Sequence, residues 1–377
     1  MDTYTFLQHY WWFLLSLLGG LLVFLFFVQG GQSLLFTLGK TETQQNMLLS
    51  SIGRKWELTF TTLVTFGGAF FASFPLFYST SFSGAYWIWI LLLLCFVIQA
   101  VSYEFQVSKG NLLGKKTYQL FLFINGIGGP VLLGTIIGTF FNGARFIIHK
   151  IQLTDIAMPV ITHWTTPWHG LEALFNLWNV SLGLTLFFLS RLLASLYFFN
   201  HIDHKEIRAQ VQIQLFRDLM PFLVFFLVFL IHTLLQDGFA YEPQNGSIYM
   251  VSHKYLHNFL DMPILLFSFT VGVILLLYAI IRTRQTQHWL KGIWFGGIGT
   301  VLVTLSLLLC VGWNYTAYYP SISDLQSSLT IKNSSSSLFT LKVMSYVSFI
   351  IPIVLTYIFY TWRTLDRHKI KEQEVEK

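Results

Sequence analysis

Long apolar runs recur from one end of the chain to the other, separated by short stretches that carry most of the charged residues. A run of roughly 20 apolar residues is long enough to cross a bilayer as a helix. Aromatic residues such as Tyr10, Trp56, Trp289 and Trp362 mark many borders of these runs, as amphipathic rings do at membrane interfaces. The pattern predicts nine membrane spans, at residues 10–35, 58–78, 86–106, 119–141, 171–199, 219–236, 261–282, 290–312 and 338–362.

The composition favours an all-α polytopic membrane protein. Of the 377 residues, 54% are hydrophobic and 11% are charged, whereas a soluble protein of this length needs a far more charged surface. The opening MDTYTFLQHYWWFLL lacks the basic start and the small-residue cleavage site of a signal peptide, so the first run is expected to be retained. Residues 1–377 are predicted to form a single integral membrane domain, because no interval between the spans is long enough for a soluble domain.

The basic residues are divided unequally between the two sides of the predicted membrane. Of the 23 Lys and Arg residues, 17 fall on one side, including the five in the tail at 363–377, and four fall on the other. By the positive-inside rule, the N-terminus is predicted outside and the C-terminus in the cytoplasm. The formal net charge of +6 reflects this asymmetry and contact with anionic lipid, and nothing in the pattern indicates nucleic-acid binding.

The sequence shows no signature of a soluble-type active site, such as a phosphate-binding glycine loop or HExxH. Candidate chemistry therefore rests on polar residues in or beside the spans. Glu57 and Glu104 lie at the cytoplasmic ends of the second and third spans. A carboxylate at this depth can take a proton from water and pass it inward, so both acids are candidates for a proton path, together with Trp56 beside Glu57. The alternative is that each is a rim carboxylate paired with Arg54, Lys55 or Lys109.

Three further polar residues lie inside the predicted spans. Gln29 and Gln32 flank a Gly-Gly pair toward the cytoplasmic end of the first span. Amide side chains can hydrogen-bond across helices, so packing is their favoured role and a place on the proton path is the alternative. Arg191 is the deepest cation in the chain, and its depth predicts a charge partner or a buried pocket, with snorkelling of the side chain as the alternative.

The histidines and cysteines do not predict a haem or metal site. Nearly all of the 11 histidines lie in loops or at span ends, and only His232 lies inside a span. A bis-histidine haem needs two facing imidazoles at matched depth, so no haem is expected to be ligated by this chain alone. Cys95 and Cys310 both lie in apolar runs and are expected to be packing residues.

Three blocks of the sequence resemble subunit II of the bacterial cytochrome bd-type terminal quinol oxidases. The first is the aromatic pair Trp11 and Trp12, with a glycine-containing end to its span. The second is KWELTFTTLVTFGGAFFASFPLFYSTSFSGAYW, which carries the pair Trp56 and Glu57 and then Gly-Gly-Ala, Pro and Phe-Ser-Gly landmarks in order. The third begins YYPSISDLQSSLT and continues into the ninth span. The resemblance covers essentially the whole chain, and its middle rests mainly on topology.

The resemblance implies a heterodimer in the bacterial inner membrane. In this family a subunit I of similar fold holds two haems b, one haem d and the quinol site. The complex oxidises ubiquinol or menaquinol and reduces dioxygen to water with protons from the cytoplasm. Subunit II is then expected to have nine helices in two groups of four plus one, to hold no haem, and to help provide a route for protons or oxygen. Membrane lipid and a small single-span accessory subunit are further expected partners.

The chain departs from the family pattern at several positions. Where the family often has two acids at the end of the first span, this chain has Gln29 and Gln32. The acid of the second span, often Asp, is Glu57, and Gln99 stands where an Arg is often found upstream of the third-span acid. These changes predict that an ion network is exchanged for amides. More of any proton-handling role is then left to Glu57 and Glu104.

Two other functions are compatible with the sequence. A secondary transporter would place a substrate pocket near Arg191, but it would be expected to show inverted repeats and helices interrupted at the membrane midplane, and neither is evident in the sequence. A purely structural subunit would shield the haems of its partner. It differs from an active oxidase subunit only in whether Glu57 and Glu104 affect the rate.

Overall fold

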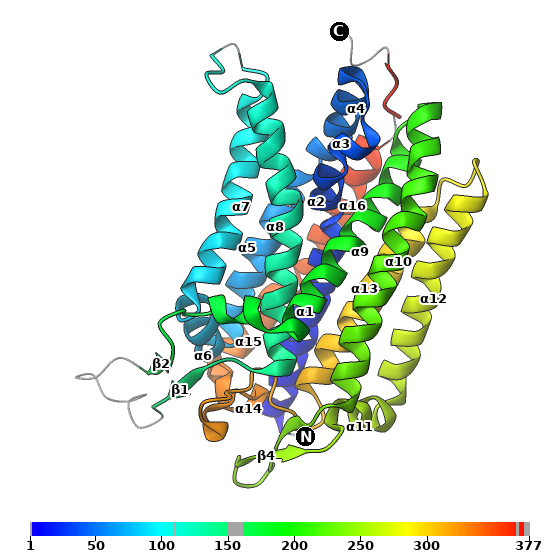
Figure 1. Ribbon diagram of the computed structural model, residues 1–377. Helices are drawn as coiled ribbons and strands as arrows, with labels where there is room; N and C mark the ends of the chain where they lie inside the picture. Colours follow the sequence, from blue (N-terminus) through cyan, green and yellow to red (C-terminus); the bar gives the residue numbers. More distant parts are fainter. Residues whose placement is uncertain (1, 109, 150–160, 367–368, 373–377) are drawn as a thin grey trace.

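The chain folds into an elongated bundle of helices with two short hairpins at one end (Figure 1). The computed structural model describes residues 2–108, 110–149, 161–366 and 369–372. Within these residues, eight helical segments are long and apolar enough to cross a membrane. The prediction of an all-α membrane bundle is therefore confirmed.

The body of the bundle consists of eleven helical pieces: α1 Thr3–Leu25, α2 Phe27–Ser33, α5 Trp56–Ser73, α7 Tyr86–Phe105, α8 Lys115–Asn142, α9 Leu177–His201, α10 Lys205–Leu235, α12 Pro263–Gln285, α13 Gly292–Gly312, α15 Leu338–Ser348 and α16 Ile351–Leu365. Short helices and turns connect them: α3 Leu35–Leu38, α4 Glu42–Gly53, α6 Pro75–Tyr78, η1 Ser79–Ser83, η3 Leu171–Phe175, α11 Lys254–Asp261, η4 Leu325–Ser327 and α14 Ile331–Ser334. The strands form two antiparallel pairs: β1 Phe146–Ile148 with β2 Thr162–Trp164, and β3 Gly238–Tyr241 with β4 Ile248–Val251.

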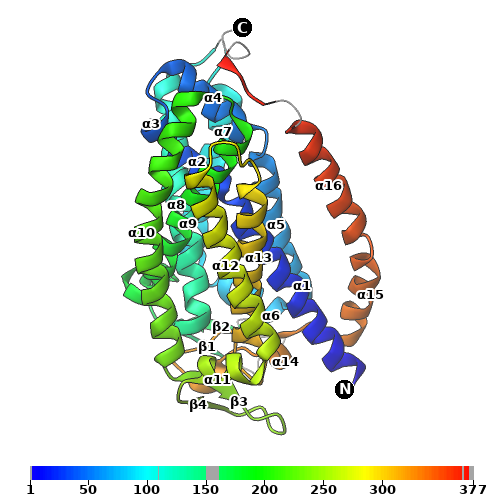
Figure 2. The same cartoon turned by 90° about the vertical axis from the view of Figure 1, so that its right-hand side faces the viewer.

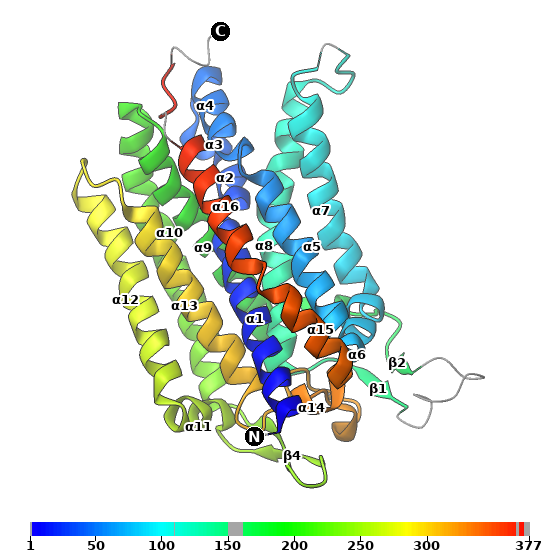
Figure 3. The same ribbon diagram turned by 180° about the vertical axis from the view of Figure 1, so that it is seen from behind.

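Helix α5 takes the place of the second predicted span. It has 18 residues and is not one of the eight candidate spans, in keeping with the polar Glu57 and the threonines in its sequence. It packs against α1 and runs alongside α7 in the views from the front and from behind (Figures 1 and 3). The number of nine spans and their grouping into two sets of four plus one stay predictions.

Helices α9 and α10 begin at other residues than the predicted spans. The segment 171–199 begins with the separate turn η3, and α9 starts only after Asn176, whose side chain accepts hydrogen bonds from the backbone N–H groups of Trp178 and Asn179. Helix α10 begins at Lys205, well before residue 219, because a charged stretch continues the helix beyond its apolar part. Hydropathy marks only the apolar part of a helix, so it does not predict such an extension.

Two of the membrane segments are interrupted. Pro352 lies in the first turn of α16 and has no N–H to donate to Ser348, so the preceding helix α15 ends there. Between α1 and α2, at Phe26, the Thr59 hydroxyl donates a 3.1 Å hydrogen bond to the Leu25 carbonyl. Helices α15 and α16 run along the outside of the bundle next to α1 and keep most of their surface exposed (Figures 2 and 3).

The two ends of the bundle differ in charge. The end at the top of Figure 1 holds α3, α4, the α7–α8 connection and the last described residues, and it carries most of the basic loops. We call it the basic end. The opposite end holds the start of α1, both hairpins, α11 and α14. The positive-inside rule predicts that the basic end faces the cytoplasm.

Candidate functional site

A cluster of side-chain amides is buried between α2, α7 and α8, and we call it the amide cluster. The Nδ2 of Asn125 donates to Oε1 of Gln32 at 2.7 Å and to Oε1 of Gln99 at 2.8 Å. The Nε2 of Gln29 donates to the same Gln99 oxygen at 3.1 Å. All four side chains are fully buried. Gln29, Gln32 and Gln99, the amides predicted to replace charges, are therefore connected by hydrogen bonds. The connection runs through Asn125, which was not predicted from the sequence.

Two glycines bring α2 close enough to its neighbours for these contacts. A Cβ atom on Gly126 of α8 would lie 2.5 Å from the backbone N of Ser33 and 2.7 Å from the carbonyl oxygen of Gln29. A Cβ atom on Gly30 of α2 would lie 2.0 Å from the carbonyl oxygen of Ser190 in α9. These distances exclude any side chain at either position. The backbone of α2 is therefore held directly between α8 and α9.

The amide cluster contains no ionisable side chain. Three of its atoms, Oε1 of Gln29, Nε2 of Gln99 and Oδ1 of Asn125, make no hydrogen bond within the described residues. Such atoms are able to bond to bound water, which commonly pairs with buried polar groups. Amides can orient a chain of hydrogen bonds, but they neither take up nor release a proton near neutral pH.

A pair of stacked rings connects the amide cluster to the basic end. The Nε2 of Gln32 donates to the hydroxyl oxygen of Tyr103 at 3.2 Å. The Tyr103 ring stacks on Trp56, with centroids 5.8 Å apart and planes 10° apart. Through this pair, α2 is linked to α7 and to the first residue of α5.

The two candidate acids directly follow the stacked rings in the sequence. Glu57 and Glu104 are both exposed on the surface of this chain. Neither forms an ion pair within the described residues. Of the predicted partners, Arg54 is also exposed, Lys55 pairs with a different carboxylate, and Lys109 lies outside the described residues. Neither acid is tied into the fold of this chain by a charge partner that the structure describes.

Arg191 of α9 has a buried carboxylate as its partner. Its Nε lies 2.9 Å from Oδ1 of Asp218 in α10, and the two side chains are 12% and 4% exposed. Its Nη1 also donates to the hydroxyl and carbonyl oxygens of Ser33 in α2, at 3.3 and 3.4 Å. A paired cation is far less costly at this depth than an isolated one. The guanidinium is therefore used in this ion pair and not in a substrate pocket of the kind that a transporter would need.

A buried lysine fastens the end of α16 to the bundle at the basic end. The Nζ of Lys55 lies 3.2 Å from Oδ1 of Asp366 and 4.6 Å from the ring centroid of Trp362. Burial of the Lys55 side chain lowers its pKa, against the opposing effect of the Asp366 charge. Asp366 also accepts a 3.1 Å hydrogen bond from the Tyr197 hydroxyl and lies 3.6 Å from Nε2 of His201. This cluster was not predicted from the sequence, where Lys55 was a loop cation and a possible partner of Glu57 or Glu104.

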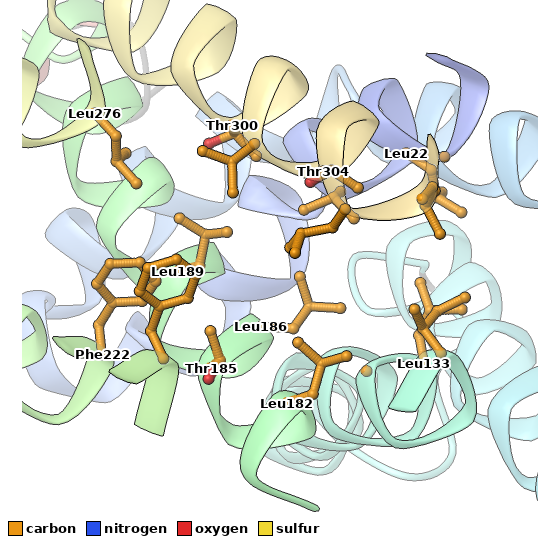
Figure 4. A pocket seen from close by; sticks show the side chains of 18 of the residues that line it. Leu22, Leu133, Leu182, Thr185, Leu186, Leu189, Phe222, Leu276, Thr300 and Thr304 are labelled. Carbon is orange, nitrogen blue, oxygen red and sulfur yellow. The ribbon is translucent and has the colours of Figure 1, made fainter. Parts of the chain in front are cut away.

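An apolar cavity of about 100 Å³ lies between α1, α8, α9, α10, α12 and α13. Its wall consists mainly of leucine and phenylalanine side chains, with hydroxyl groups from Thr185, Thr300 and Thr304 (Figure 4). The described residues that line it include no His, Met or Cys, which are the usual axial ligands of a haem iron. The size and the chemistry of the cavity therefore do not fit a haem.

The histidine inside a span has contacts of a packing kind. His232 of α10 stacks on Trp178 of α9, with ring centroids 3.8 Å apart. Its Nε2 lies 3.2 Å from Oδ1 of Asn142 in α8. His232 thus links three helices near the opposite end of the bundle.

Comparison with known proteins identifies relatives of this chain. The family described as cytochrome bd terminal oxidase subunit II matches residues 7–365. The chain belongs to this family. Subunit 2 of the cytochrome bd-I ubiquinol oxidase of Escherichia coli K12 is 25% identical, over 100% of this chain and 98% of its own length. Subunit 2 of the cytochrome bd ubiquinol oxidase of Bacillus subtilis 168 is 32% identical over 36% of this chain and 40% of its own length.

The fold of subunit II is also that of a solved structure. A chain of the bd oxidase from Geobacillus thermodenitrificans matches with a TM-score of 0.68, over 95% of this chain and 98% of that chain, at 10% sequence identity. Family and helices together show a multi-pass protein of the bacterial inner membrane, as predicted. The resemblance found in the sequence is confirmed. The roles of Glu57, Glu104, Trp56, Gln29 and Gln32 on a proton path stay predictions.

Proposed function

We propose that this chain is subunit II of a membrane quinol oxidase whose subunit I oxidises quinol and reduces dioxygen to water. The observation that carries the proposal is the family match over residues 7–365, together with full-length similarity to a ubiquinol oxidase subunit of Escherichia coli. Each dioxygen takes four electrons from two quinols and four protons from the cytoplasm. The quinols release their protons at the outer face, so the reaction builds a proton gradient.

The haems b and d are assigned to subunit I in this proposal. The apolar cavity of this chain supports the assignment, because the described residues that line it supply leucine, phenylalanine and threonine side chains and no axial ligand. The contribution of subunit II is then to stabilise its partner and to help supply protons.

The face of α5 turned away from the bundle is the proposed docking surface for subunit I. Thr61, Thr65 and Gly68 are exposed along it, and a Cβ atom on Gly68 would meet nothing within 4 Å. Val64 and Phe71 are exposed on α5 as well, so its face combines small, hydroxyl-bearing and apolar side chains, whereas the exposed face of α12 carries mainly bulky apolar ones such as Phe267 and Ile274. Small and hydroxyl-bearing residues allow close packing of helices in a membrane, whereas bulky apolar ones suit lipid. The α5 face is therefore the better surface for a partner helix.

Helices α15 and α16 extend this docking surface. They lie on the same side of the bundle as α5 in the view from behind (Figure 3). Only 11% of the residues in their most apolar stretch are buried within the chain. Ion pairing of Lys55 with Asp366 holds the end of α16 in this position.

The docking surface also carries the proposed route for protons. Glu57, Thr61 and Thr65 follow one another at intervals of one helical turn, and all three are exposed. A carboxylate can take a proton from the cytoplasm, and hydroxyl groups can both accept and donate hydrogen bonds along a path. Glu104 lies at the same end of the bundle. We assign proton uptake to these two acids and not to the amide cluster, which has no ionisable side chain.

The remaining candidates have a positioning role in this proposal. Gln29 and Gln32 hold α2 against α7 and α8. Tyr103 accepts a hydrogen bond from Gln32 and stacks on Trp56, so it connects α2 to the start of α5. A purely structural subunit is the second candidate function, and the uncharged amide cluster favours it. The two candidates differ in whether substitution of Glu57 slows turnover at unchanged haem content.

Purification of the chain together with its partner tests the main proposal. We expect a stable complex with the absorption band of haem d and with oxygen consumption that requires quinol. A stable complex without this band and without quinol-dependent oxygen consumption would rule out the oxidase function. The same preparation reveals whether the predicted single-span accessory subunit is present.

A further inference from the structure

A second and larger cavity opens at the opposite end of the bundle. Its volume is about 720 Å³, and it lies between α7, α8 and the segment at 164–179 that leads into α9. The green segment containing η3 packs against α8 and forms one wall (Figure 1). Helices α15 and α16 lie on the other side of the molecule (Figure 3). The cavity is therefore on a side away from these docking helices.

The rim of this cavity is apolar and exposed where a membrane segment begins. Trp168, Phe175 and Leu177 are 52%, 73% and 80% exposed, and α9 starts at the last of them. Exposed rings at the start of a span are typical of the zone between acyl chains and headgroups. The inner wall includes the buried side chains of Ile88 in α7 and Ile136 in α8. An amphipathic molecule could thus place an apolar part inside and a polar part at the rim.

Two opposite charges line the same cavity. The side chain of Arg145 is exposed and forms no ion pair within the described residues. The carboxylate of Glu172 accepts hydrogen bonds from the Thr166 hydroxyl at 2.7 Å and from the Gly170 N–H at 2.9 Å. These bonds hold Glu172 in place, and an ionised carboxylate has further acceptor sites for a cation. The cavity therefore suits a ligand that carries both an anionic and a cationic group.

We propose that this cavity binds a zwitterionic aminophospholipid from the leaflet at this end of the bundle. The phosphate pairs with Arg145, the primary ammonium pairs with Glu172, and the start of an acyl chain lies along Ile88 and Ile136. A quinone headgroup is uncharged and would give neither Arg145 nor Glu172 a charge partner. A purely anionic lipid would satisfy Arg145 but would be repelled by Glu172.

Native mass spectrometry of the complex with subunit I tests this site. The probes are phosphatidylethanolamine and phosphatidylglycerol with the same acyl chains. We expect the unmodified complex to retain phosphatidylethanolamine in preference to phosphatidylglycerol. Arg145→Gln should lower retention of both lipids about tenfold, because it removes a charge-assisted bond to phosphate. Glu172→Gln should shift the preference toward phosphatidylglycerol, because it removes the carboxylate that repels an anionic headgroup.

Matched variants separate a lipid site from a general effect of charge. Lys332→Gln removes a cation at the same end but outside the cavity, and it should leave retention of both lipids unchanged. Arg145→Lys keeps the charge and should retain most of the binding. Equal retention of the two lipids by the unmodified complex, or Arg145→Gln and Glu172→Gln variants that bind like it, would overturn the proposal. If Glu172→Gln fails to assemble, Arg145→Gln still decides, because this exposed side chain has no ion pair that the structure describes.

Discussion

Gln29 of α2 and Gln99 of α7 are joined by a 3.1 Å hydrogen bond between two fully buried amides. A neutral pair of this kind needs no counter-ion, and its burial costs less than that of isolated charges. The same neutrality prevents the pair from carrying a proton. This relationship is why we assign proton uptake to the exposed acids Glu57 and Glu104.

The amide cluster should depend most on Asn125, which donates to two neighbours. Asn125→Leu leaves the carbonyl of Gln32 without this donor and weakens the contact to Gln99, so we expect a loss of about 1–3 kcal/mol in stability. Thermal unfolding of the purified complex measures this loss. Thr270→Val on the exposed face of α12 removes a hydroxyl that bonds only within its own helix, and it should change little. Equal losses in the two variants would show that the cluster has no special role.

The contact of α2 with α9 should not tolerate a side chain at Gly30. A Cβ atom there would lie 2.0 Å from the Ser190 carbonyl oxygen, so Gly30→Ala is expected to destabilise the bundle by about 3 kcal/mol or more. The yield of monodisperse complex from membranes measures the effect. Gly110→Ala is the control, because a Cβ atom at that position meets nothing within 4 Å. A normal yield for Gly30→Ala would contradict the close approach of the two helices.

Docking of subunit I should be sensitive to bulk at Gly68. A tryptophan there leaves the fold of this chain intact, because the space around the glycine is open within the chain, but it blocks a partner helix. We expect Gly68→Trp to reduce the amount of subunit I that copurifies about tenfold. Ile274→Trp on the exposed face of α12 should not reduce it, because that face is assigned to lipid. Equal copurification in both variants would place the docking surface elsewhere.

The ion pair of Lys55 and Asp366 at the basic end can be tested by removing Asp366 alone and then both partners. Asp366→Asn leaves the buried ammonium of Lys55 without its counter-ion, which is expected to cost about 2–4 kcal/mol and to loosen α16. Thermal unfolding and protease access to the C-terminal segment report the change. Lys55→Met combined with Asp366→Asn should recover most of the loss. A double variant as unstable as Asp366→Asn would mean that the ion pair is not the cause.

The stability of the Lys55–Asp366 cluster at the basic end should also depend on pH. Burial lowers the pKa of Lys55 below its ordinary value of 10.5. Between the lowered pKa and 10.5, the unfolded chain binds more protons than the folded chain, so stability rises with pH in this window. The defect of Asp366→Asn should therefore shrink as the pH rises toward 10.5, as measured by unfolding temperature. The double variant, which lacks the lysine, should show no such change.

Much of the fold could be predicted from hydropathy alone. The apolar runs locate eight of the long segments, since a membrane helix must be apolar over most of its length. The start of α10 could not be predicted in this way, because Lys205 and the charged residues after it belong to the helix but not to the apolar run. The turn η3 was likewise included in a predicted span, because its residues are as apolar as those of α9.

The amide cluster was predictable only in part. Gln29, Gln32 and Gln99 stand where the resembled family often has charges, and this pattern suggested that they act together. Asn125 is a single polar residue in an apolar run, and neither its spacing nor its type indicates which neighbour it faces. Its role becomes visible only when α8 is placed against α2 and α7.

Charge partners that are distant in the sequence were harder to predict. The depth of Arg191 predicted a charge partner or a buried pocket. The partner Asp218 lies at the border of a predicted span, where a solvated acid is common. Lys55 and Asp366 lie near opposite ends of the chain, and each looks like a loop residue beside other charges. Their pairing depends on how α16 returns to the start of α5, which no local pattern encodes.

The oxygen consumption of a Glu57→Gln complex, driven by quinol and expressed per haem d, tests proton uptake at the docking surface most directly. We predict a rate about tenfold lower than in the unmodified complex at unchanged haem content, with most of the rate kept in Glu57→Asp, which retains a carboxylate. An unchanged rate for Glu57→Gln from about pH 6 to about pH 9, at normal haem content, would contradict this role and leave the chain a purely structural subunit.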